Sequence, residues 1–317
     1  MKRATTMKQL NNNILNIYPS SETNKITSFI KKTLEKEGFK NVVIGMSGGI
    51  DSTTSFYLLR EALAPENIIV AHLYYFRSQF KDIKPILKES KIPKENIYEI
   101  SIAPMVRTFQ SHLEGVVPQH LRGGPLRSEA SQMDSSKVNR QHHLGGGRLE
   151  RSVSRDSYEV NRVRLGNIMA RIRMIILFDL AKKHNGLVAG TENKSEFLLG
   201  YFTRHGDEAS DFEPIQHLYK TQVVQLAKYL QIPKTIIDKT PTAGLWEGQS
   251  DEGEFGFSYK EADNVLYLYF EKKMSVSEIS KKGFQAAKKI ISWVDKNSFK
   301  HKLPYKLNSK HKITNIN

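Results

Sequence analysis

The sequence predicts an α/β fold: a doubly wound, mainly parallel five-stranded sheet with helices on both faces and further helices at the C-terminus. Short apolar runs alternate with helical patterns along the chain, and strands that alternate with helices form parallel sheets covered on both faces. The first apolar run leads through two glycines directly into a helical pattern. The 317 residues are 39% hydrophobic, which is enough to bury a sizeable core.

The expected elements follow one another in a regular order. A helix is expected over residues 23–38, because Ile26, Phe29, Ile30 and Leu34 share one face. The remaining patterns predict strands at 42–46, 68–75, 97–102 and 187–190, and helices at 54–64, 79–90, 104–115, 165–184 and 220–230.

Two short helical patterns over residues 275–297 can be interpreted in two ways. Ser275 and Glu278 form a capping-box signature at the start of the first. A helix–turn–helix with lysines is typical of small DNA-binding units. Ordinary packing helices are far commoner, so we favour C-terminal packing.

Residues 117–160 break the alternation. They are rich in Gly, Ser, Arg, Gln and His and show no hydrophobic period, which predicts a flexible insertion. The pair His142 and His143 lacks an acid or cysteine at ligand spacing, so metal binding is not expected there. Residues 22–304, apart from this insertion, are predicted to form a single domain, with residues 1–21 and 305–317 as basic or polar tails.

Composition narrows the class of protein. Cysteine is absent, which removes disulfides, thiolate metal sites and a cysteine nucleophile from consideration. No apolar run approaches the roughly 20 residues that span a bilayer, and the N-terminus lacks the apolar stretch of a signal peptide. We therefore expect a cytoplasmic protein with no membrane partner.

The net charge of +15 is concentrated at the two ends of the chain. Residues 1–40 carry 8 Lys and Arg against 3 acids, and residues 281–317 carry 10 Lys against 1 acid. A basic excess favours an anionic partner, either nucleic acid or a phosphate-rich small molecule. Solvated lysine-rich ends that aid solubility are the commoner explanation of such a pattern.

The sharpest local feature is the segment Ser47-Gly48-Gly49-Ile50-Asp51-Ser52, which follows an apolar strand and opens a helix. In that position backbone N–H groups and the positive helix end bind anions, and glycines allow close approach. Ser47 and Ser52 add hydroxyl donors. Asp51 is compatible with bound phosphates if Mg²⁺ lies between them. A tight turn with a helix cap is the alternative, but the whole pattern favours a phosphate loop, although it lacks the Gly-Lys-Ser/Thr ending of a Walker A loop.

This motif resembles the pyrophosphate loop of the ATP pyrophosphatase superfamily, whose fold is adenine nucleotide alpha hydrolase-like. The resemblance implies cleavage of ATP between the α- and β-phosphates to adenylate a substrate oxygen. Amidating synthetases, argininosuccinate synthetase and tRNA-modifying enzymes share the loop, so the loop alone leaves the substrate open.

Four separated blocks in the second half narrow the substrate. The chain from about residue 22 to 304, apart from the insertion, resembles ammonia-dependent NAD synthetase. The blocks that carry this resemblance are residues 165–173, 190–211, 214–223 and 241–252.

The residues of these blocks suit the implied chemistry. Thr191 follows a short strand, at the sheet edge where ligands bind in open α/β folds. Glu196 is a second carboxylate that can share Mg²⁺ with Asp51. Lys220 and Thr242 can contact ATP phosphates. Arg171, by itself, is better explained as a solvated surface arginine than as an anion or ribose contact.

The resemblance implies a role for each position. It places Asp51 and Glu196 on Mg²⁺, and Asp51, Ser47, Ser52 and Lys220 in catalysis. It places ATP on Gly45, Met46, Ser47, Gly48, Gly49, Ile50, Asp51, Ser52, Thr191, Lys220 and Thr242, and deamido-NAD on Arg171, Arg204, Asp211, His301 and Lys302.

Two residues depart from the family pattern. Many relatives have lysine where this chain has Arg204, and relatives often have glycine where Glu208 stands. The arginine keeps the charge but changes the geometry of its contacts. Glu208 is expected to stiffen or reposition its loop.

The reaction implied is ATP-dependent amidation of deamido-NAD to NAD through an adenylated intermediate, with release of AMP and pyrophosphate. Glutamine-dependent relatives carry an added amidohydrolase domain with a nucleophilic cysteine. Here about 40 residues precede the first expected strand and there is no cysteine. Free ammonia is therefore the expected nitrogen source, unless a separate subunit supplies it. The resemblance also implies a homodimer, and no nucleic-acid partner is expected.

Two rival functions stay open at this point. One is another adenylating enzyme of the superfamily, such as a tRNA-modifying enzyme, which the net charge favours slightly. The other is a nucleic-acid-binding protein built on an inactive synthetase. The intact acids Asp51 and Glu196 and the intact loop argue against an inactive site.

Overall fold

The computed structural model describes residues 14–76, 78–114, 148–246, 248–302 and 304–305. Its centre is a parallel sheet with the strand order β3-β2-β1-β4. The strands are β1 (Asn41–Gly45), β2 (Ile68–Tyr74), β3 (Ile97–Ser101) and β4 (Gly186–Ala189). The prediction of a parallel α/β fold is confirmed. Most of the predicted insertion lies outside the described residues, namely its residues 117–147. Most of the two predicted tails also lies outside them.

The number of strands differs from the prediction. Within the part of the chain that the structure describes, the sheet has four strands, not five. Phe212 reaches the open edge of β4 but forms only an isolated parallel bridge with Ala189. The reason is that the Asp211 carboxylate accepts the Val188 N–H at 2.7 Å, a donor that a neighbouring strand would otherwise take with its backbone. Pro214 follows two residues after the bridge and cannot donate to a ladder.

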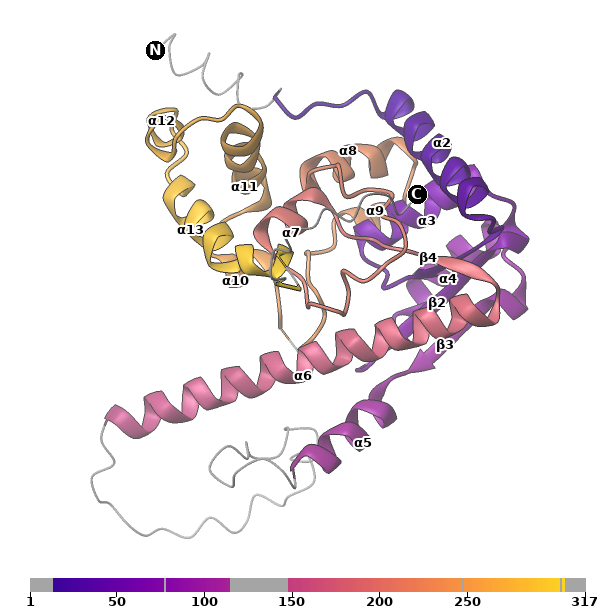
Figure 1. Cartoon of the computed structure of the whole chain (residues 1–317), viewed down its shortest axis with the longest axis horizontal. Helices are drawn as coiled ribbons and strands as arrows, with labels where there is room; N and C mark the ends of the chain where they lie inside the picture. The colour runs from indigo at the N-terminus through magenta and orange to yellow at the C-terminus, as the bar shows by residue number, and fades with distance from the viewer. Residues whose placement is uncertain (1–13, 77, 115–147, 247, 303, 306–317) are drawn as a thin grey trace, which may run out of the picture.

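Helices cover both faces of the sheet (Figure 1). One core packs the alternate strand residues Val42, Ile44, Ile68 and Val70 against α2, α3, α4 and α8. These helices are α2 (Pro19–Glu37), α3 (Ile50–Ala62), α4 (Phe80–Glu89) and α8 (Lys220–Tyr229).

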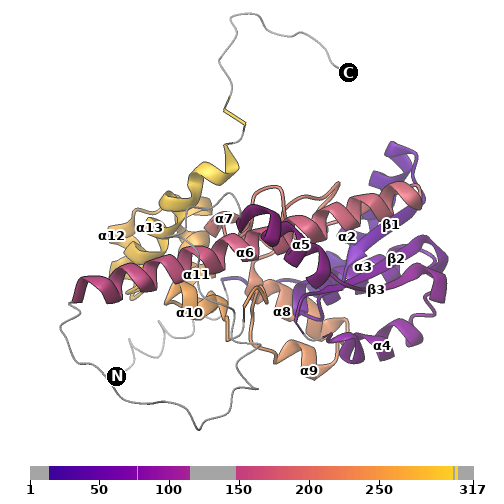
Figure 2. The same cartoon turned by 90° about the horizontal axis from the view of Figure 1, so that it is seen from below.

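The other face packs against two helices, α5 (Ala103–Glu114) and α6 (Arg148–Lys183). Val43, Ile69 and Ala71 point into this second core, opposite to their neighbours along each strand. Figure 2 shows α5 lying against α6 on this side. Both faces are therefore covered, as the two apolar sides of each strand require.

Helix α6 is longer than expected, because it begins at Arg148 instead of near residue 165. Residues 148–160, predicted as part of a flexible insertion, are helical. The prediction relied on a hydrophobic period, which requires a buried face. The stretch from Arg148 to Arg164 contains neither Gly nor Pro, so nothing in it interrupts a helix. The 36 residues of α6 extend over about 54 Å.

A third core forms away from the sheet, at the end of the molecule where α10 to α13 gather (Figures 1 and 2). Ser275 caps α12, with its hydroxyl accepting the Glu278 N–H at 3.3 Å. Ile279 of α12 and Ile290 of α13 are buried, which supports packing over DNA reading for this helix pair. The helices here are α10 (Asp251–Phe255), α11 (Tyr259–Leu266), a π-helical turn (Tyr267–Glu271), α12 (Val276–Lys281) and α13 (Ala287–Asn297).

The short connecting elements complete the fold. They are α7 (Lys194–Leu199), α9 (Lys234–Ile237) and 3₁₀ turns at Pro65–Asn67, Lys94–Asn96 and Ser298–His301. Among the described helices, none combines the length and the apolarity that a membrane crossing requires.

Gly186 provides a test of how closely β4 approaches β1. A Cβ added there would lie 2.7 Å from the backbone oxygen of Asn41, so one of two paired strands must shift. We expect Gly186→Ala to lower the free energy of unfolding by about 2 kcal/mol or more, measured by urea denaturation.

Gly38→Ala is the comparison. Gly38 ends α2 with φ +75°, and a Cβ added there would meet open space, so its replacement should cost only about 1 kcal/mol. Equal losses for the two variants would contradict the steric explanation.

Candidate functional site

A cavity of about 690 Å³ opens at the carboxyl ends of β1, β2 and β4. One wall is the turn between β1 and α3. The opposite wall comes from α6 and from the loops around residues 200–209 and 239–249. Every predicted ATP contact lines this cavity except Gly48; those that line it are Gly45, Met46, Ser47, Gly49, Ile50, Asp51, Ser52, Thr191, Lys220 and Thr242.

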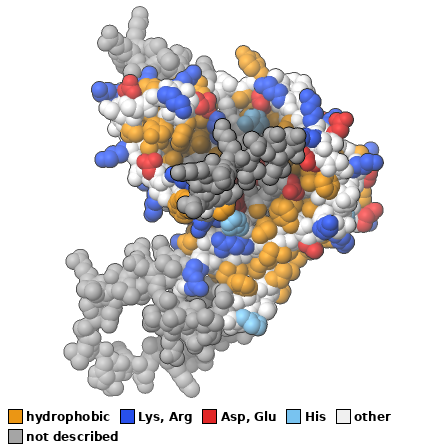
Figure 3. Space-filling view, viewed as in Figure 1, with side chains coloured by type: hydrophobic (Ala, Val, Ile, Leu, Met, Phe, Trp, Pro, Cys, Tyr) orange, Lys and Arg blue, Asp and Glu red, His pale blue; other side chains and the backbone are white. Residues whose placement is uncertain are grey.

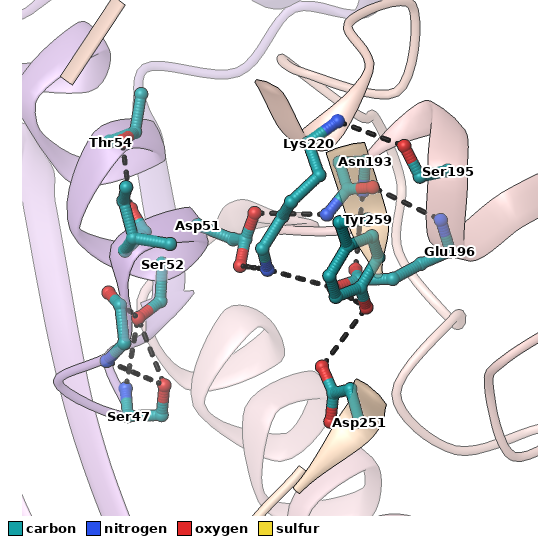
Figure 4. A network of polar contacts seen from close by, with 12 residues as sticks. Ser47, Asp51, Ser52, Thr54, Asn193, Ser195, Glu196, Lys220, Asp251 and Tyr259 are labelled. Atoms are coloured by element: carbon teal, nitrogen blue, oxygen red, sulfur yellow. Dashed lines mark hydrogen bonds and ion pairs between the residues drawn. The ribbon is translucent and has the colours of Figure 1, made fainter. Parts of the chain in front are cut away.

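The turn from β1 into α3 is held by its own serines (Figure 4). The two hydroxyls of Ser47 and Ser52 lie 3.0 Å apart, and the Ser47 hydroxyl accepts the Gly49 N–H at 3.2 Å. Gly48 has φ +78°, a conformation that disfavours any side chain. The loop is therefore preformed, with the N-terminus of α3 beside the cavity, where an anion is stabilised.

Three charged side chains from distant parts of the sequence meet beside this loop (Figure 4). The Nζ of Lys220 lies 2.5 Å from Asp51 Oδ2 and 3.2 Å from Glu196 Oε1. Asp51 comes from α3, Glu196 from α7 and Lys220 from the first residue of α8. Asp51 and Glu196, which the sequence analysis expects to share Mg²⁺, both contact the Lys220 ammonium in this structure.

Neutral groups fix the position of each charge. The Asn193 side chain donates to Asp51 at 2.9 Å and also caps α7 by accepting the Glu196 N–H at 3.0 Å. The Ser195 hydroxyl accepts the Lys220 N–H at 2.9 Å and donates to buried Asp263 at 2.5 Å. The cluster is therefore tied to the starts of α7 and α8.

Burial and charge act against one another in this cluster. Burial by itself would lower the pKa of Lys220, but Asp51 and Glu196 raise it above its ordinary value. Burial raises the pKa of Glu196, and Lys220 opposes that rise. Asp251 adds a further negative charge, held by the Tyr259 hydroxyl at 3.0 Å. Lys220 is consequently a firmly charged ammonium inside an acidic surround.

The donor set fits Mg²⁺. The carboxylates of Asp51 and Glu196 already converge on one cation, the Lys220 ammonium. Carboxylate oxygens in small number, with room for water and substrate phosphates, are the ligands that Mg²⁺ takes in nucleotide sites. Among the described residues no group of three His, Cys, Asp or Glu is arranged for a metal.

Comparison with known proteins identifies the family. A family model described as NAD synthase matches residues 22–130 and 148–304. The NH(3)-dependent NAD(+) synthetase of Fusobacterium nucleatum is 34% identical over 89% of this chain and 93% of its own length. The chain belongs to the NAD synthase family. Members with this name are ligases that form a carbon–nitrogen bond.

Solved structures agree on the fold. The NMN synthetase of Francisella tularensis has a TM-score of 0.68 at 28% identity, over 93% of this chain and 100% of that one. The NH3-dependent NAD synthetase of Campylobacter jejuni has a TM-score of 0.61 at 26% identity, over 92% and 100%.

The residues predicted to bind deamido-NAD lie outside the cavity lining. The Nε of Arg171 donates to the Arg204 backbone oxygen at 3.1 Å, and Arg204 lies over the Phe299 ring. Asp211 is engaged with the backbone of β4. His301 packs against Phe197, with ring centroids 4.5 Å apart, and neither it nor Lys302 lines the cavity.

Two residues close to them in the sequence, Arg173 and Lys300, do line the cavity. Arg173 faces it, with Nε donating to the Leu73 backbone oxygen at 3.0 Å. Two residues along a helix correspond to roughly 200° of rotation, which is why Arg173 and Arg171 point to opposite sides. Lys300 donates to the backbone oxygens of Gly200 and Phe202 at 2.6 and 2.8 Å. The alignment of the C-terminal tail rests on few residues, so the sequence held no clear signal for Lys300 over its neighbours.

Glu208, the departure from the family pattern, has a local structural role. Its carboxylate accepts the backbone N–H groups of His205 at 2.9 Å and of Gly206 at 3.1 Å. His205 has φ +58°, a conformation that costs energy for a residue with a side chain. The two bonds hold the turn, which matches the expectation that Glu208 stiffens this loop.

A second acidic pair lies behind the cavity wall. Glu192 is 7% exposed, and its Oε2 accepts the Gln216 side chain at 2.7 Å, while its Oε1 is buried without a partner. The neighbouring Glu213 accepts the Glu192 N–H at 3.1 Å. Burial raises the pKa of Glu192 to about 9, so the folded protein holds a proton there at neutral pH.

This proton makes stability depend on pH in a defined direction. The folded state keeps the proton up to about pH 9, whereas the unfolded chain releases it near its ordinary value of 4.5. The free energy of unfolding should therefore fall as pH rises across this window. Glu192→Gln removes the ionisation at nearly constant size, and we expect a smaller loss of melting temperature between pH 6 and pH 9 than in wild type.

Glu61→Gln, at a half-exposed position on α3, is the control for removing one negative charge. Parallel pH profiles for wild type and Glu192→Gln would contradict the assignment.

Proposed function

We propose that the chain uses ATP to amidate deamido-NAD with free ammonia, through an acyl-adenylate, and releases AMP, pyrophosphate and NAD. The observation that carries the proposal is the Asp51–Lys220–Glu196 cluster beside a preformed phosphate loop. Both line the same cavity at the carboxyl edge of the sheet, where open α/β folds bind their ligands. The match to the NAD synthase family over most of the chain supports the choice of substrate.

The first step activates the carboxylate. An oxygen of the nicotinate carboxylate attacks the α-phosphorus of ATP, and the bond from that phosphorus to the bridging β-oxygen breaks. The backbone N–H groups at the start of α3 and the hydroxyls of Ser47 and Ser52 stabilise the charge that develops on pyrophosphate. Thr191 and Thr242 line the cavity as further polar contacts for ATP.

Asp51 and Glu196 would hold Mg²⁺ at the phosphates. The ion supplies charge neutralisation for the triphosphate when it is bound. The contribution of this chain is to fix the two carboxylates: Asn193 orients Asp51 and the start of α7 orients Glu196. Lys220 keeps the carboxylates from repelling one another.

The second step forms the amide. Ammonia attacks the acyl carbon of the adenylate, the carbon–oxygen bond to AMP breaks, and the added nitrogen loses a proton. None of these bonds requires a covalent nucleophile from the protein. The side chains position two polyanionic substrates and exclude water. Positioning of the reactants supplies a large part of the rate acceleration of such a reaction.

We also propose that two copies of the chain pair through α5 and α6. Met105 and Phe109 on α5 and Ile175 on α6 are large apolar side chains with 44–60% of their surface exposed. Figure 3 shows hydrophobic side chains gathered over this region. Apolar side chains clustered at a surface mark interaction sites, and the family resemblance favours a second copy as the partner.

The turnover assay tests the function. Purified protein is supplied with ATP, Mg²⁺, deamido-NAD and ammonium, and both NAD and AMP are quantified. We expect equal amounts of the two products. Asp51→Asn removes one carboxylate from the cluster and should lower kcat/KM by about 100-fold or more.

Asp238→Asn is the matched control, since Asp238 is an exposed carboxylate at the end of α9. AMP formation without NAD would leave adenylation in place but contradict the acceptor or the nitrogen donor. A parallel assay offers a nicotinate mononucleotide acceptor, because one similar structure is an NMN synthetase. Turnover that requires tRNA would favour the rival adenylating enzyme.

The dimer has a separate test. Phe109→Glu places a charge within the exposed apolar region, and we expect light scattering to show a monomer with little change in melting temperature, because Phe109 is 50% exposed.

Tyr229→Glu is the control, an aromatic residue of 49% exposure on α8. A wild-type monomer at micromolar concentration, or a Phe109→Glu dimer as stable as wild type, would refute pairing through this face.

A further inference from the structure

Lys220, the lysine expected to contact the ATP phosphates, is already paired with carboxylates of the protein. Lys220 lies within 3.2 Å of two carboxylates, Asp51 and Glu196. The Lys220 ammonium is therefore engaged by the protein's own carboxylates. A lysine beside the phosphate loop that is not paired with a carboxylate is a better candidate for direct contact with the phosphates.

Lys239 lies on the other side of the loop. Its side chain lines the cavity, and its Nζ donates to the Gly48 backbone oxygen at 3.4 Å and to the side-chain oxygen of Gln79. Both acceptors are uncharged. Among the described residues no carboxylate lies within ion-pair distance of Lys239; the charge acting on it comes from Asp82 through space.

Buried His72, which is 3% exposed, bonds to the backbone of the two segments that carry these acceptors. The Gln79 N–H donates to His72 Nε2 at 3.2 Å, so Nδ1 carries the proton and donates to the Met46 backbone oxygen at 2.9 Å. This imidazole joins the start of α4 to the phosphate loop. Lys239 is consequently held next to the loop by groups that do not neutralise it.

We propose that Lys239 binds the pyrophosphate end of ATP and stays with pyrophosphate as it leaves. The proposal rests on the proposed function, since it assigns a residue within the same site. A phosphate oxygen forms a stronger hydrogen bond with an ammonium than an amide or backbone oxygen does, so Lys239 exchanges Gly48 and Gln79 for the phosphates. Thr242, three residues further on, lines the cavity beside it.

Binding experiments with separate parts of the substrate test this role. Calorimetry on the full chain with Mg²⁺ measures the affinity for inorganic pyrophosphate, for ATP and for AMP. We expect Lys239→Met to weaken the binding of pyrophosphate and of ATP roughly 10- to 100-fold and to leave AMP unchanged. Lys239→Arg keeps the charge and should retain most of the affinity for pyrophosphate.

Lys234→Met is the matched control, since it removes an equal charge from a side chain that is 88% exposed five residues away. Wild-type affinity for pyrophosphate in Lys239→Met overturns the proposal. Equal weakening of AMP, or an equal loss in Lys239→Arg, assigns Lys239 to the shape of the loop instead and also overturns it. Wild-type protein that binds pyrophosphate through Lys239 but forms no NAD contradicts the proposed reaction and leaves the role of Lys239 standing.

Discussion

The buried contact of Lys220 with Asp51 and Glu196 is the interaction on which the site depends. It joins the first turns of α3, α7 and α8, of which α3 lies far from the other two in the sequence. A charge buried without partners costs several kcal/mol, so these helices cannot separate without exposing the lysine or its carboxylates. The same contact places the Lys220 ammonium between the carboxylates of Asp51 and Glu196. These are the two carboxylates that we propose hold Mg²⁺ when ATP is bound.

The sheet and the phosphate loop were predictable because both depend on local sequence. The strands are short apolar runs, and the loop is set by two glycines between a strand and a helix. The parallel order then places Asp51 and Glu196 at the same edge. Lys220 was expected to contact ATP phosphates, but its pairing with Asp51 and Glu196 was not predicted; it follows from the start of α8 lying at that same edge.

The differences arise where position depends on non-local contacts. The expected fifth strand had no assigned position, and at the open edge of β4 Phe212 forms only a bridge, because the Asp211 side chain, and not a backbone group, bonds with Val188. The start of α6 was missed because a helix of 36 residues needs no continuous apolar stripe. Arg173 and Lys300 reach the cavity through helix rotation and through the path of the C-terminal tail. Lys239 was missed because no motif marks a lysine that is held by uncharged acceptors.

The length of α6 links the cavity to the outer surface. Asn167, Arg173 and Met174 line the cavity, while Ile175 of the same helix is 60% exposed. A helix resists compression along its axis, so a displacement imposed at one of these positions is carried to the other. Thermodynamic linkage then requires reciprocity: if filling the cavity changes how tightly the exposed face associates, association changes the affinity of the cavity by the same factor. Substrate saturation curves of this chain would then vary with protein concentration, as they do in enzymes whose subunit association is linked to substrate binding.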